Sequence, residues 1–153
     1  MEIKFIGGAE YKAANSCRHI ELTKNFNFFI DLKSYWLPSG YQCDGASIPR
    51  IFWSIIGSPF DPEKVPAAFC HDAIYLTHAV SRPVADEVLF QLLLQGGCRL
   101  RTARTMWTAV RVGAWWAWKN NAEDKSDLAK TRTTIEARPD IELFRSLWFA
   151  QTP

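Results

Sequence analysis

The chain lacks the features that define membrane-spanning, disulfide-rich and zinc-finger proteins. No apolar run in its 153 residues approaches the roughly 18 residues needed to cross a bilayer, and its start lacks the long apolar stretch of a signal peptide. The four cysteines are widely spaced and form no Cys-x-x-Cys pair, which favours reduced thiols. These absences predict a protein that is made in the cytoplasm and is soluble when made.

The chain also has little excess charge of one sign, because 18 lysine and arginine residues are nearly balanced by 16 aspartate and glutamate residues, for a formal net charge of +2. Such a mild charge argues against nucleic acid as the main partner. The length suits one core, with roughly 68–70% of the unfolded surface buried on folding. We therefore expect one domain over residues 1–119, a polar linker over residues 120–139 and a C-terminal docking segment over residues 140–153.

The order of the expected elements indicates an α+β fold. Residues that favour strands gather in the first third and are separated by Gly, Pro and Asn turn signals. The expected strands are residues 3–6, 19–23, 26–32 and 35–37. They predict a small N-terminal antiparallel sheet, followed by a three-helix unit and the C-terminal segment.

Two of the three expected helices form an antiparallel hairpin. The first ends near Thr77, and the second begins near Ser81 with Pro83 in its first turn. His71 and Asp86 lie almost equally far from the intervening turn. Because such residues face each other in a tight helical hairpin, the spacing predicts an imidazole beside a carboxylate.

The neighbours of Asp86 predict that its carboxylate points inward. Asp86 shares a helix face with Leu89 and Leu93, while the polar residues of the same helix lie on another side. A buried carboxylate needs a hydrogen-bond donor or a metal, and His71 is the nearest candidate. A catalytic dyad and a structural clasp between two helices explain this pair equally well.

Four short motifs occur in an order that resembles a family of small tailed-phage and prophage proteins sharing a domain of unknown function. They cover roughly residues 1–118. The motifs are Asp44-Gly45-Ala46-Ser47-Ile48-Pro49-Arg50, His71-Asp72-x-x-Tyr75, Ser81-Arg82-x-x-Ala85-Asp86 and Val110-Arg111-x-Gly113. This resemblance implies a phage origin, with synthesis in the bacterial host cytoplasm and incorporation in the virion, but it implies no particular chemistry.

A shorter stretch of about 25 residues, with His71-Asp72-x-x-Tyr75 on one helix and Asp86 on the next, resembles phospholipase A2 of the prokaryotic and parvoviral type. The resemblance implies that His71 is the general base, Asp86 its orienting partner and Tyr75 a support of their network. It also implies that Asp72 binds calcium, which would polarise an ester carbonyl.

The chain departs from phospholipase A2 at the loop that completes the calcium shell. Those enzymes place a glycine-rich loop just before the catalytic helix, whereas residues 44–47 lie more than twenty residues earlier and hold one glycine. Either Asp44 supplies a side-chain ligand beside Asp72, or the loop is structural, since Asp-Gly commonly forms a turn. A mononuclear metal site of His71, Asp86 and Asp44 is a further possibility with no motif behind it.

The third expected helix, from about Thr102 to Lys119, carries a basic stripe close to several tryptophans. The candidate binding residues are Arg104, Arg111, Trp115 and Trp116. The helix is either a core helix with a solvated face or an interfacial surface for lipid headgroups or another anionic partner.

Two function classes therefore fit the sequence. In the first, a phospholipase A2-like site hydrolyses ester bonds in lipids or cell-envelope material with calcium. In the second, the chain is a non-catalytic phage structural or host-interaction protein, the His71–Asp86 pair is a clasp, and the C-terminal segment binds other phage proteins.

Overall fold

The computed structural model describes most of the chain between residues 3 and 119. The described residues are 3–6, 8–13, 19–31, 33–43, 57–58, 61–115 and 118–119. The predicted linker and C-terminal docking segment lie outside them, as do the predicted site residues Asp44 and Trp116.

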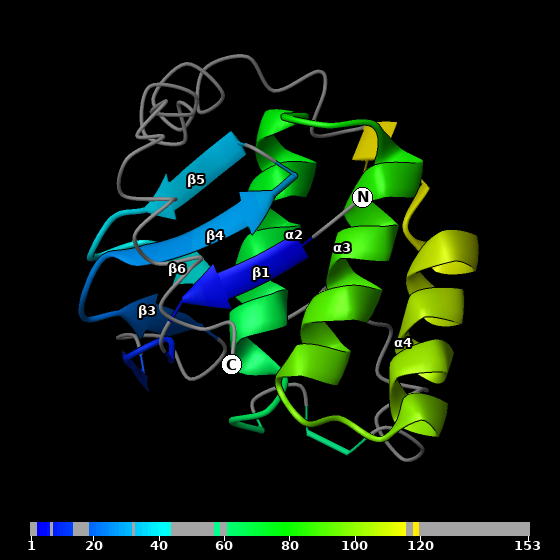
Figure 1. Cartoon of the computed structure of the whole chain (residues 1–153), viewed down its shortest axis with the longest axis horizontal. Helices are drawn as coiled ribbons and strands as arrows, with labels where there is room; N and C mark the ends of the chain where they lie inside the picture. The colour runs from blue at the N-terminus through cyan, green and yellow to red at the C-terminus, as the bar shows by residue number, and fades with distance from the viewer. Residues whose placement is uncertain are drawn as a thin grey trace.

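The predicted α+β fold is confirmed, with strands first and helices after them (Figure 1). The strands are β1 (Ile3–Ile6), β2 (Tyr11–Ala13), β3 (Ile20–Leu22), β4 (Phe26–Ile30), β5 (Lys33–Leu37) and β6 (Gln42–Cys43). The helices are α2 (Val65–Thr77), α3 (Arg82–Gln95) and α4 (Leu100–Gly113).

The described strands form two antiparallel sheets where the sequence predicted one. The strand orders are β1-β4-β5 and β2-β3-β6, so the consecutive strands β3 and β4 belong to different sheets. Alternation of apolar residues indicates which segments are strands and which side of each is buried, but it does not determine which strands are neighbours. The short strands β2 and β6, which complete the second sheet, lacked a sequence signal of their own.

The hairpin between β4 and β5 corrects one predicted boundary. The sequence predicted a strand over residues 26–32, but β4 ends at Ile30 because Asp31 adopts a positive φ of 53°. Ile30 pairs with Lys33, which leaves a two-residue loop. A positive φ in such a loop matches the strand twist and is tolerated well by Asp.

The three helices lie side by side, with α3 between α2 and α4, and the β1-β4-β5 sheet lies against α2 and α3 (Figure 1). Helix α4 begins two residues earlier than predicted and ends at Gly113, with Ala114 as its C-cap. Trp115, Trp118 and Lys119 are again helical, so the helix predicted to reach Lys119 is interrupted at Ala114. Glycine weakens a helix, which accounts for an interruption after Gly113. One continuous core joins the sheets to all three helices.

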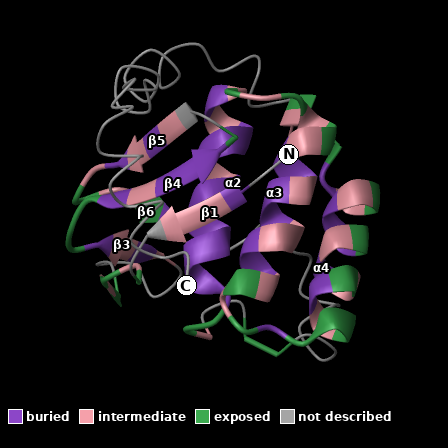
Figure 2. Cartoon of the chain, viewed as in Figure 1, coloured by how far each residue is buried: buried purple, intermediate pink, exposed green. Residues whose placement is uncertain are grey.

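Burial differs sharply between the helices (Figure 2). Helix α2 is buried almost all round, whereas α4 lies at the edge of the helical layer and exposes its outer side. The candidate site lies along α3, at the places where α3 contacts α2 and α4.

Candidate functional site

Helix α2 places His71 in the core. Pro66 lies in its first turn, where the missing N–H is not needed, and the helix ends at Thr77, followed by the C-cap His78 in a left-handed conformation with φ of 51°. Because most side chains between Pro66 and Thr77 are apolar, the helix packs on several sides at once. His71 is only 4% exposed.

Helix α3 returns antiparallel to α2 and brings Asp86 to His71. The helix begins after Ser81 with Pro83 in its first turn, as predicted. His71 Nε2 lies 3.3 Å from Asp86 Oδ1, and the Asp86 side chain is completely buried. The two residues that are equidistant from the turn therefore meet.

Tyr75 completes a three-residue network on the same carboxylate oxygen. Its hydroxyl donates a hydrogen bond of 2.5 Å to Asp86 Oδ1. One helical turn separates Tyr75 from His71, so their rings also contact each other, with centroids 4.1 Å apart. The predicted catalytic residues His71, Tyr75 and Asp86 thus lie in one buried cluster.

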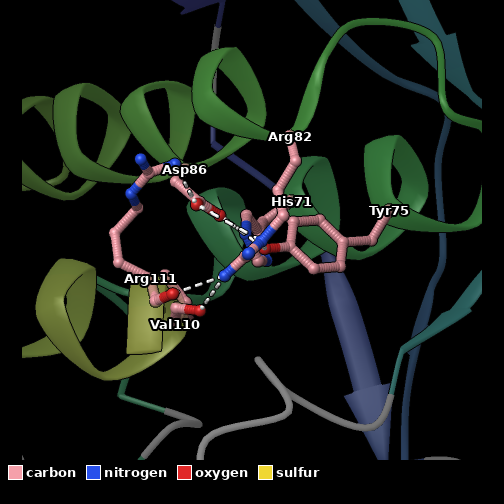
Figure 3. Close-up of polar contacts among 6 residues, drawn as sticks. All are labelled: His71, Tyr75, Arg82, Asp86, Val110 and Arg111. Carbon is pink, nitrogen blue, oxygen red and sulfur yellow. Dashed lines mark hydrogen bonds and ion pairs between the residues drawn. The ribbon is translucent and has the colours of Figure 1, made fainter. Parts of the chain in front are cut away.

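Two arginines approach the other oxygen of Asp86 (Figure 3). Arg111 Nη1 of α4 donates a hydrogen bond of 3.1 Å to Asp86 Oδ2, and Arg82 Nε lies 3.9 Å from the same oxygen. Arg82 also donates through Nη2 to the carbonyl oxygens of Val110, at 3.1 Å, and of Arg111. It thereby satisfies carbonyl groups at the end of α4 and ties that helix to the pair.

The pKa values of the pair favour neutral His71 beside ionised Asp86. Burial lowers the pKa of His71, and this effect outweighs the opposite effect of Asp86. Burial would raise the pKa of Asp86, but hydrogen bonds from His71, Tyr75 and Arg111 together lower it. Burial, followed by the hydrogen bond to Asp86, raises the pKa of Tyr75, so Tyr75 stays protonated as a donor.

The predicted calcium ligand Asp72 is half-buried next to His71 and accepts a hydrogen bond from a residue beside β6. The Tyr41 hydroxyl donates to Asp72 Oδ2 at 3.0 Å. Burial and the neighbouring Asp72 carboxylate raise the pKa of Tyr41 well above its ordinary value, which keeps it a donor. Tyr41 precedes the predicted ligand Asp44 by three residues in the sequence.

Within the described part of the chain, no three or more His, Cys, Asp or Glu side chains gather in the manner of a metal site. A calcium shell built on Asp72 would therefore need Asp44, backbone carbonyl groups or water as further oxygen ligands. Cys70, adjacent to His71, is fully buried, and burial raises the pKa of its thiol well above the ordinary value, so Cys70 is a poor nucleophile.

The predicted binding residues of α4 do not all lie together. Arg104 is exposed and Trp115 is 57% exposed, whereas Arg111 turns toward Asp86 and its guanidinium lies 5.8 Å from the Trp107 ring centroid. Arg111 is thus a partner of the His71–Asp86 pair, a role that the sequence did not predict.

Two more site residues were missed. Arg82 precedes Asp86 by one helical turn, and this four-residue spacing is a signal that sequence reasoning can use. The contact between Tyr41 and Asp72 joins residues that are 31 apart in the sequence, and no local sequence pattern predicts it.

Fold and site together define an α+β domain whose helical hairpin encloses a hydrogen-bonded His-Asp-Tyr cluster. The chain belongs to the family described as "Protein of unknown function (DUF1353)", whose model matches residues 20–110. It is similar to "Uncharacterized protein y4jT" of Sinorhizobium fredii (strain NBRC 101917 / NGR234), with 42% identity over 67 residues. Those residues are 43% of this chain and 19% of that protein, so the chain spans about a fifth of that relative's length. No solved structure shows significant similarity to the chain.

Proposed function

We propose that the chain is a phage or prophage hydrolase with a phospholipase A2-like site, acting on ester bonds in lipids or cell-envelope material. One observation carries the proposal, namely that His71 and Tyr75 both bind the buried carboxylate of Asp86. A general base needs a neutral imidazole whose tautomer is set by a carboxylate. The arrangement of His71 and Asp86 supports that role.

In the proposed reaction, His71 removes a proton from the attacking water through Nδ1. Asp86 accepts the hydrogen bond from Nε2, which keeps the proton on that nitrogen and stabilises the imidazolium that forms. Tyr75 and Arg111 hold the carboxylate in place. The lowered pKa of His71 keeps the base neutral at pH 7.

Asp72 and Asp44 would hold calcium, with Tyr41 orienting the Asp72 carboxylate. Oxygen ligands suit this ion. When bound, calcium would polarise the ester carbonyl.

The test is release of fatty acid from mixed phospholipid vesicles, with and without calcium. His71→Ala should lower the rate by about 10²–10⁴-fold, the usual contribution of a general base. His78→Asn is the matched control, because it replaces a histidine at the end of the same helix and Asn tolerates the left-handed conformation there. The proposal fails if folded wild-type protein releases no fatty acid, or if both variants behave alike.

Calcium binding is measured separately by isothermal titration calorimetry. Wild type should bind calcium and Asp72→Asn should not, because the substitution removes one ligand charge. Equal heats for the two proteins would rule out Asp72 as a ligand.

A second candidate function is a non-catalytic phage structural or host-interaction protein with the pair as a clasp. The observation that favours it is the saturation of Asp86 by donors from both neighbouring helices, including Arg111. A clasp predicts a large loss of stability on changing Asp86, together with no hydrolysis and no calcium binding by the folded wild type.

A further inference from the structure

Helix α4 has two chemically different faces. Its buried side consists of small and medium apolar residues: Ala103, Met106, Ala109 and Val110. Its exposed side carries Arg101, Arg104, Thr108 and Val112, which recur every three or four residues and so lie on one stripe. Trp115 and Lys119 extend the exposed side beyond the helix end, and we refer to these six residues as the α4 face.

Exposed large apolar side chains gather on α4 and directly after it. Among the described residues, the large exposed hydrophobic side chains are Leu100 (49% exposed), Val112 (75%) and Trp115 (57%), and all three lie on α4 or directly after it. Two of them, Val112 and Trp115, belong to the α4 face. Apolar side chains gathered at one exposed place indicate a contact surface, whereas single scattered ones do not.

The same segment carries charge of one sign. Residues 97–119 contain five arginine and lysine residues and no aspartate or glutamate, although the whole chain has a net charge of only +2. Arg111 is engaged by Asp86, but Arg101, Arg104 and Lys119 remain on the exposed side. The α4 face is therefore complementary to an anionic partner.

We propose that the α4 face docks the protein on the surface of an anionic phospholipid membrane. Trp115 and Val112 would enter the boundary between headgroups and acyl chains, while Arg101, Arg104 and Lys119 would contact lipid phosphates. No helix of the described part is long and apolar enough to cross a bilayer, so the contact is one of lying on the surface.

The mixture of residues favours a lipid surface over the other anionic partners. A nucleic acid is bound mainly through contacts of basic residues with its phosphates, to which an exposed Val112 adds nothing. Self-association through this face would bring like charges together. Apolar anchors within a basic stripe match the layered chemistry of a membrane, where anionic phosphates overlie acyl chains.

Docking through the α4 face is independent of the proposed hydrolysis, because membrane binding needs no ester cleavage. The His71–Asp86 pair lies on the other, buried side of α4, where Arg82 and Arg111 join the end of the helix to Asp86.

The experiment is flotation of the full chain with two vesicle types, pure phosphatidylcholine and phosphatidylcholine mixed with phosphatidylglycerol. We expect binding to the mixed vesicles only, weakening as salt is raised. Arg101→Gln with Arg104→Gln should reduce the affinity by about 25-fold, at about fivefold for each basic side chain. Trp115→Ser should reduce it by about tenfold.

The matched control is Lys12→Gln with Lys24→Gln, which removes the same charge. These side chains are 61% and 70% exposed and pair with Glu21 and Glu10 by β3, at the opposite edge of the molecule in Figure 1. The control should bind the mixed vesicles as wild type does. All variants should show the same circular dichroism spectrum as the wild type, because the substituted side chains are exposed.

Five outcomes would overturn the proposal. The first three are no binding to the mixed vesicles, equal binding to both vesicle types, and equal weakening of binding by the substitutions at Lys12 and Lys24. The fourth is single-stranded DNA displacing the protein at an affinity equal to that for lipid. The fifth is a dimer in sedimentation velocity that Trp115→Ser dissociates, which would make the α4 face an interface between two copies.

Discussion

Helices α2 and α4 are almost equal in length but use their residues in opposite ways. Eleven of the thirteen residues of α2 are buried, against four of the fourteen of α4. In α2 the polar side chains are held inside, as when Thr77 Oγ1 donates to the Ala73 carbonyl at 2.7 Å. In α4 the polar and basic residues gather on one side. The comparison shows that a helix buried on nearly all sides can hold polar side chains in fixed positions inside the core. An amphipathic helix at the edge instead exposes one side for contact with a partner.

The largest expected effect tests this comparison by shortening one apolar side chain on each helix. Phe69→Ala in α2 should lower the free energy of unfolding by about 3–5 kcal/mol, because it leaves a cavity around a fully buried ring. Val112→Ala in α4 should change it by less than about 0.5 kcal/mol, because Val112 is 75% exposed. Urea denaturation measures both values, and similar losses would contradict the burial difference.

A comparable loss is expected at the residue of α3 that joins the two helices. Asp86→Asn should cost roughly 3 kcal/mol, at the lower end of the range for breaking a buried charged pair, because the amide oxygen can still accept from Tyr75. Glu87→Gln is the matched control on the same helix, where the side chain is half-buried and bound to Gln91. If Glu87→Gln lowers the free energy of unfolding as much as Asp86→Asn does, the hydrogen bonds of Asp86 make no special contribution to stability.

A smaller effect should appear in the pH dependence of stability. The folded state lowers the pKa of His71 below its ordinary value of about 6.5, so unfolding takes up a proton and stability falls as the pH drops below that value. The slope is at most about 1.4 kcal/mol per pH unit. Asp86, whose pKa is also lowered, contributes stability that is lost further down, as the pH falls from about 3.9 through its folded value.

Urea denaturation between pH 7.5 and 5 measures the His71 contribution. His71→Gln should flatten the curve in this range, because glutamine does not titrate. An unchanged slope in His71→Gln would mean that other groups cause the acid sensitivity.

The smallest effect separates two arginines on α4. Arg111→Gln should cost about 1 kcal/mol, because Arg111 donates to buried Asp86 but is itself partly exposed. Arg104→Gln should change stability by less than about 0.5 kcal/mol, since Arg104 is exposed. Thermal unfolding of both variants measures the difference, and equal stability would place Arg111 on the solvent side with Arg104.

The helical hairpin was predictable because its signals are local. Ser81 and Pro83 mark a helix start, and equal distance from the turn pairs His71 with Asp86. The inward direction of Asp86 followed from the apolar residues around it. The function of this pair stays a prediction, because a base and a clasp need the same hydrogen bonds.

The rest of the site could not be read from neighbouring residues. Arg111 reaches Asp86 across 25 residues because α4 packs on α3, and Tyr41 reaches Asp72 because the second sheet lies against α2. The division of the strands into two sheets was missed for the same reason. Pairing depends on contacts between distant segments.

By itself, the sequence determined the α+β order of elements, the helical hairpin with His71 facing Asp86, and the basic and tryptophan-rich character of residues 99–119. These follow from periodicity, helix signals and charge, which are properties of contiguous residues. Only the tertiary structure decided that Arg82 and Arg111 join the carboxylate and that Trp115 is exposed beside Val112. Packing brings distant side chains together, and their burial sets both their charge state and their accessibility.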